Sequence, residues 1–108
     1  MKLTSKELEV MITLWGCETP LTTAEIIEST PDRTWQKDSV FAIVNTLIKK
    51  GAVFFETYKP TEGKHARVYK PLITIEDYAM EAIQNLRDSG MKIDISTLAD
   101  RLKKAGKR

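Results

Sequence analysis

Side chains able to bind phosphates or base edges recur between residues 35 and 67. The basic ones are Lys37, Lys49, Lys64 and Arg67, and the polar ones are Ser39, Asn45 and Thr46. Lysine and arginine attract phosphate oxygens, whereas an asparagine amide can form two hydrogen bonds with adenine. These residue types favour a phosphate-rich partner, and duplex DNA is the first candidate.

The charge of the chain is unevenly distributed. Residues 1–30 hold two basic and five acidic side chains, residues 31–71 hold eight and four, and residues 72–108 hold seven and six. The middle segment therefore carries a charge of +4, although the whole chain carries only +2. Phosphate binding needs such a local patch more than a high overall charge. The alternative is that these lysines only solvate helix ends.

A helix beginning near residue 37 or 38 would position most of these side chains. Its apolar residues recur at helical spacing, and they are Val40, Ile43, Val44, Leu47 and Ile48. Gly51 follows two lysines and predicts the helix end. The other faces would carry Phe41, Ala42, Asn45, Thr46 and Lys49. Phe41 and Ala42 could touch thymine methyl groups, and Ser39 could bind a phosphate or cap the helix.

Two helices are predicted before this one and a β-hairpin after it. Capping boxes at Thr4–Glu7 and Thr22–Glu25 open the first two helices, and a short extended segment is expected at Leu21. The first helix has its apolar stripe at Leu8, Met11, Ile12 and Trp15. Strands are expected over residues 53–58 and 66–69, with a turn over 60–65. This order predicts an α+β, mainly α, winged helix-turn-helix.

The C-terminal third continues with amphipathic helices that the winged helix does not need for its core. Their apolar positions include Ile75, Tyr78, Ala79, Ala82, Ile83, Leu86, Leu98 and Leu102. We therefore divide the chain into a DNA-binding domain, residues 1–72, and a helical dimerisation segment, residues 73–108. The apolar faces could also fold back on the same chain, but two-fold dimers commonly read DNA half-sites.

Several other classes of protein are disfavoured. No Gly-rich phosphate loop, HExxH or GxSxG motif occurs, so we expect no enzyme and no cofactor. His65 is the only histidine and Cys17 the only cysteine, so we expect no metal site. No apolar run approaches the length of a membrane span, and a lone cysteine fits a reducing cytoplasm.

Four segments together resemble the penicillinase-repressor (BlaI/MecI-like) family. The segments are residues 3–15, residues 21–26, residues 35–51 and the wing at residues 64–71. The resemblance covers about residues 3–86. It implies a cytoplasmic homodimer that binds a palindromic operator through the winged helix and pairs through its C-terminal helices. It also implies that Trp35 supports the recognition helix and offers its N–H to a phosphate.

The chain departs from this family at three points. The recognition helix has Phe41, Ala42 and Thr46 where the family usually has threonine and a basic residue. No phenylalanine follows an asparagine, so the Asn-Phe bond cleaved during family induction is absent, and so is the cysteine cluster of the copper-responsive members. The sequence identifies no upstream sensor or protease. We expect a repressor, and the alternative is a winged helix that binds another protein.

Overall fold

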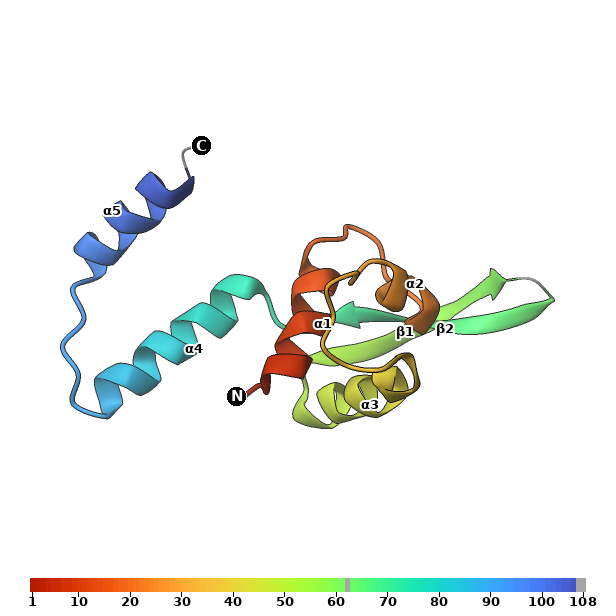
Figure 1. Cartoon of the computed structure of the whole chain (residues 1–108). Coiled ribbons are helices and arrows are strands. Elements are labelled where there is room, and N and C mark those ends of the chain that lie inside the picture. The colour runs from red at the N-terminus through yellow and green to blue at the C-terminus, as the bar shows by residue number, and fades with distance from the viewer. Residues whose placement is uncertain (62, 107–108) are drawn as a thin grey trace. The chain divides into compact units, whose positions relative to one another are not determined.

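The computed structural model describes residues 1–61 and 63–106 (Figure 1). In chain order the elements are α1 (Ser5–Trp15), α2 (Thr23–Glu28), a 3-10 turn (Lys37–Ser39), α3 (Val40–Lys50), β1 (Val53–Thr61), β2 (Lys64–Pro71), α4 (Ile75–Asp88) and α5 (Ile95–Gly106). The chain forms two compact units, Met1–Ile75 and a second one that begins at Glu76. The predicted mainly α winged helix is confirmed.

Both predicted capping boxes are present. Thr4 Oγ1 accepts a hydrogen bond from the Glu7 amide at 3.2 Å, and the Glu7 carboxylate accepts one from the Thr4 amide at 2.9 Å. Thr22 and Glu25 repeat the arrangement at 3.1 and 2.9 Å. Each box satisfies backbone donors that a helix start leaves unpaired, which is worth about 1 kcal/mol.

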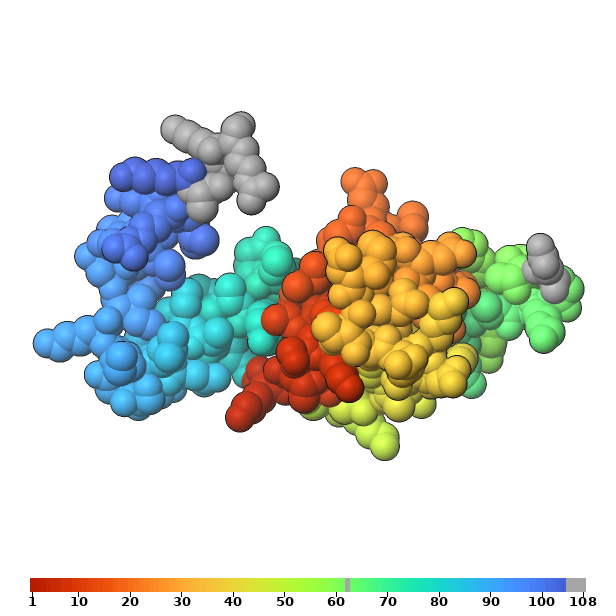
Figure 2. Space-filling view, in the orientation of Figure 1, coloured from red at the N-terminus to blue at the C-terminus, as the bar shows by residue number. Residues whose placement is uncertain are grey.

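The core of the first unit lies between the three N-terminal helices and the base of the hairpin. Its fully buried large side chains are Val10, Met11, Leu14, Ile26, Val44, Leu47 and Val53. Leu21 forms an isolated antiparallel bridge with Tyr69, which confirms the predicted extended segment. This segment lies beside β2 of the hairpin. In Figure 2 the helices of the first unit, coloured red to yellow, pack closely together, while the green hairpin extends beyond them.

Two isoleucines that we expected in buried stripes are exposed. Ile12 is 57% exposed and Ile48 is 37% exposed. The buried face of α1 is formed by Glu7, Val10, Met11 and Leu14, which follow i, i+3, i+4, i+7 spacing, and Ile12 lies about 100° away from Met11. Ile48 lies at the edge of the stripe on α3, beyond the last buried position at Leu47.

The hairpin is longer than predicted. The expected turn over residues 60–65 is largely paired, with Pro60 opposite His65 and Thr61 opposite Lys64. Proline is compatible with a two-stranded ribbon because both strands have an open edge. A register irregularity between Phe55 and Thr57 leaves Glu56 as an extra residue in β1. Such a bulge reverses the alternation of side chains along the strand.

The apolar positions that we assigned to dimerisation are exposed or half-buried, and all of them except Ile75 belong to the second unit. Helix α4 has no buried residue. Tyr78, Ile83 and Leu98 are half-buried, and the exposed ones are Ile75, Ala79, Ala82, Leu86 and Leu102. Among the described residues, no helix combines the length and apolar character required to cross a membrane.

Candidate nucleic-acid interface

Helix α3 has one face buried in the core and another face that is exposed. Val40, Ile43, Val44 and Leu47 are buried, whereas Phe41, Ala42, Asn45 and Lys49 are exposed. The exposed positions recur at helical spacing, so they share one face. These four side chains therefore lie away from the core, as the helical spacing predicts. Lys49 is the only cation that α3 itself carries on this face.

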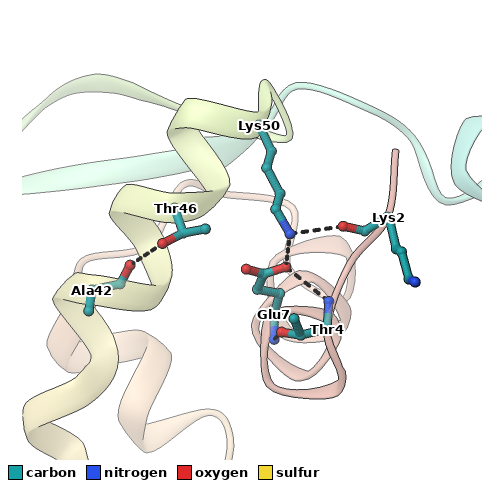
Figure 3. A network of polar contacts seen from close by, with 6 residues as sticks. All are labelled: Lys2, Thr4, Glu7, Ala42, Thr46 and Lys50. Carbon is teal, nitrogen blue, oxygen red and sulfur yellow. Dashed lines mark hydrogen bonds and ion pairs between the residues drawn. The ribbon is translucent and has the colours of Figure 1, made fainter.

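Thr46 differs from its neighbours because its hydroxyl already has a partner. Its Oγ1 donates to the Ala42 carbonyl at 2.9 Å, and the side chain is half-buried (Figure 3). The hydroxyl proton is therefore unavailable to a base. The oxygen lone pairs and the methyl group remain as possible contacts with DNA.

The segment before α3 is a 3-10 turn and not the first turn of the α-helix that we expected. Lys37 and Asp38 are exposed in this turn, and Ser39 is half-buried at the N-cap position of α3. The Ser39 side chain makes no capping hydrogen bond. Ser39 therefore occupies the N-cap position that the alternative predicted, but its hydroxyl does not cap the helix and remains able to bind a phosphate.

Trp35 is placed differently from the expected phosphate contact. The side chain is 4% exposed, and its Nε1 is buried without a hydrogen-bond partner in the described part of the chain. The Arg33 guanidinium lies over the ring, 5.6 Å from its centroid. The expected support of α3 fits this position, but an N–H contact with a phosphate does not, because the nitrogen is covered. Packing the large indole has outweighed the unmet hydrogen bond.

The two predicted wing residues lie on opposite faces of the hairpin. Lys64 and Arg67 are both exposed in β2, and their odd spacing turns the side chains in opposite directions. The Arg67 guanidinium lies over the Phe55 ring at 5.3 Å, and Phe55 meets Tyr58 edge-on at 5.0 Å. Phe55 and Tyr58 are three residues apart in β1, and the bulge between them explains how both side chains reach the same face.

Three other cations of residues 31–71 are engaged within the protein. Lys50 Nζ binds Glu7 Oε1 at 2.5 Å and the Lys2 carbonyl at 2.8 Å (Figure 3). Lys59 Nζ binds Glu25 Oε2 at 2.8 Å. Arg33 Nη1 donates at 3.2 Å to carbonyls of the last turn of α2 and the loop after it. The two lysine pairs connect segments that are distant in the sequence, so no local sequence pattern revealed them.

The carboxylates in these pairs have altered acidity. Burial alone would raise the pKa of Glu7, but hydrogen bonds from Lys50 and the Thr4 amide outweigh it and lower that pKa. The hydrogen bond from Lys59 lowers the pKa of Glu25, with the Thr22 amide as a further cause. Both carboxylates are therefore charged at neutral pH, and each fixes one lysine.

A groove of about 330 Å³ lies between the beginning of α3 and the wing. Its lining residues are Thr23, Phe41, Tyr58, His65, Ala66, Arg67 and Tyr69. Of these, only Phe41 and Arg67 are among the predicted contact residues. Tyr58 was missed because its orientation depends on the bulge, which has no clear sequence signal. Among the described residues, no cluster of histidine, cysteine and carboxylate side chains could hold a metal ion.

Comparison with known proteins identifies a family. A family model described as penicillinase repressor matches residues 3–106. The match extends beyond the expected residues 3–86 and includes α5. A search of curated proteins finds no match.

Proposed function

As a member of the penicillinase repressor family, the chain is a DNA-binding transcriptional repressor, and we propose that it acts as a cytoplasmic homodimer on a palindromic operator. The observation that carries this proposal is the group of exposed cations at both ends of α3 and on the wing. Lys37, Lys49, Lys64 and Arg67 are exposed, and none has a carboxylate partner in the described part of the chain. Such side chains are available to neutralise phosphates.

Helix α3 would lie in the major groove with its exposed face toward the bases. Asn45 would pair with an adenine, and Phe41 and Ala42 would contact thymine methyl groups. Ser39 and Thr46 would contribute polar contacts from the edges of this face. The four cations would fix the position of the protein along the backbone but would not select a sequence.

The apolar stripe of α4 would form the dimer interface, together with Leu98 and Leu102 of α5. Its side chains are exposed or half-buried in the single chain, and covering them would gain hydrophobic free energy. A two-fold dimer presents two equal reading helices, which matches an operator made of two inverted half-sites.

Salt dependence tests the phosphate contacts. For the wild-type chain, the affinity for a labelled duplex should fall steeply as salt increases, because binding releases counterions. Arg67→Ala should weaken binding to every duplex and reduce the log–log slope by about one. Lys92→Ala, an exposed cation of the second unit, is the matched control and should keep the slope. An unchanged slope for Arg67→Ala would remove Arg67 from the set of contacts.

The alternative function is docking to another protein, and the observation that favours it is the 60% exposure of Phe41. A surface made for a protein partner would bind duplex DNA weakly and with little dependence on salt. The same titration therefore separates the two functions. A steep wild-type slope supports the repressor.

A further inference from the structure

The groove between α3 and the wing joins one arginine to a mostly aromatic wall. His65, Arg67 and Tyr69 alternate along β2, so their side chains lie on the face of the hairpin that borders the groove. Phe41 and Tyr58 also line it and are 60% and 52% exposed. Among the described residues that form the lining, none is acidic. These features favour an anion that also carries apolar surface.

Arg67 is held in place at this groove before any ligand arrives. Its guanidinium lies over the Phe55 ring, 5.3 Å from the centroid, and Tyr58 meets that ring edge-on. A restrained guanidinium loses less side-chain freedom on binding, and its planar fork matches a carboxylate through two parallel hydrogen bonds. Within the described part of the chain Arg67 has no carboxylate partner, so a carboxylate from outside can take this position.

The size and the wall of the groove define the rest of the ligand. Its volume of about 330 Å³ is at the small end of the roughly 300–1,000 Å³ that ligand pockets occupy, which suits a body of one or two rings. Phe41 and Tyr58 can cover such rings, and paired aromatic rings gain more than burial alone provides. We propose that the groove binds a small aromatic carboxylate, with the carboxylate on Arg67 and the rings against Phe41 and Tyr58.

This ligand regulates DNA binding by competition. Under the proposed function, Arg67 contacts a phosphate and Phe41 contacts a thymine methyl group. A ligand that occupies both side chains excludes the duplex, so a rise in its concentration releases the operator. The ligand site itself goes beyond the proposed function, and only its regulatory effect rests on that function.

Proton NMR of the full chain tests the site, because His65 is the only histidine of the sequence and lines the groove. Its ring signal, followed at constant pH, should shift and saturate as naphthoate is added. Acetate, which lacks the rings, and naphthalenemethanol, which lacks the charge, should shift it much less at equal concentration. Arg67→Gln should weaken naphthoate binding about tenfold, which corresponds to about 1.4 kcal/mol.

Arg87→Gln provides the matched control, since Arg87 is an exposed arginine of α4 that does not line the groove. This variant should bind naphthoate as tightly as the wild type. A His65 signal that stays in place, or that moves equally with acetate, would overturn the site. Equal naphthoate affinity of Arg67→Gln and the wild type would overturn the assigned role of Arg67.

Fluorescence anisotropy of a labelled duplex tests the regulatory effect. Naphthoate should release the duplex from the wild-type chain, whereas acetate at matched ionic strength should not. Duplex binding that is unchanged when the His65 titration is saturated would overturn the competition but leave the site standing. A chain that binds no duplex at all would overturn the proposed function, and the His65 titration would still decide whether the ligand site exists.

Discussion

At the scale of single residues, the cations of residues 31–71 have two different roles. Lys50 and Lys59 each neutralise a carboxylate, whereas Lys37, Lys49 and Lys64 have no such partner among the described residues. Net charge counts both groups equally, although only the second is free to bind phosphate. Replacing Lys50 or Lys59 should therefore alter DNA affinity through the arrangement of α3 and the wing, and the salt slope should change little.

Glu7 shows how such a pair contributes to stability. The carboxylate is buried, with 6% exposed, and it binds Lys50 and the Thr4 amide. Glu7→Gln should lower the free energy of unfolding at neutral pH by about 1–2 kcal/mol, because the amide oxygen still accepts hydrogen bonds but lacks the negative charge that strengthens them. Urea unfolding monitored by circular dichroism measures this difference.

The pH dependence of that difference has a defined sign. Because the pKa of Glu7 is lowered by folding, its stabilising effect is complete above the unfolded-state pKa and is lost as the pH falls through the folded-state pKa. The wild-type and Glu7→Gln chains should therefore converge in stability in acid. Glu56→Gln, at an exposed residue of the bulge, is the control and should match the wild type. A constant difference at all pH values would contradict the role of the charge.

At the scale of elements, α3 and the wing are connected by a residue with an unusual backbone. Gly51 ends α3 with φ +80°, in the left-handed region, and its amide donates to the Ile48 carbonyl. A Cβ at this position would meet no atom within 4 Å, so only the backbone conformation opposes a larger residue. Gly51→Ala should destabilise the protein by about 1 kcal/mol, measured by urea unfolding.

Gly51→Asn is the matched comparison, since asparagine adopts the left-handed region more readily than alanine. It should lie between the wild type and Gly51→Ala in stability. Equal stability of all three chains would show that this turn does not need the left-handed conformation.

Features within one element could be predicted from the sequence, whereas contacts between elements could not. The capping boxes and the Gly51 helix end depend on residues within one turn of each other, so spacing alone identified them. The Glu7–Lys50 and Glu25–Lys59 pairs join residues 43 and 34 positions apart, and nothing local marks them. The bulge in β1 likewise depends on cross-strand pairing. It turns Tyr58 toward the groove, and this is why Tyr58 was absent from the predicted interface.

At the scale of the whole molecule, a repressor that reads two half-sites needs two copies of the reading unit. Leu86 is 52% exposed on the apolar stripe of α4. If the proposed dimer forms through α4, Leu86→Asp should sediment as a monomer, because the substitution would bury a carboxylate at the interface. Met80→Asp is the control, since Met80 is 63% exposed and lies off the stripe. A Leu86→Asp chain that remains dimeric would place the interface elsewhere.

Selection of bound duplexes from a random pool, at moderate salt and with the full wild-type chain, tests the central claim most directly. A dimeric repressor should enrich a palindrome whose half-sites are separated by about one turn of the double helix. Asn45→Ala should relax the preference at one position of each half-site. Enrichment of no sequence, with only weak retention of random duplexes, would contradict the claim of an operator-binding repressor.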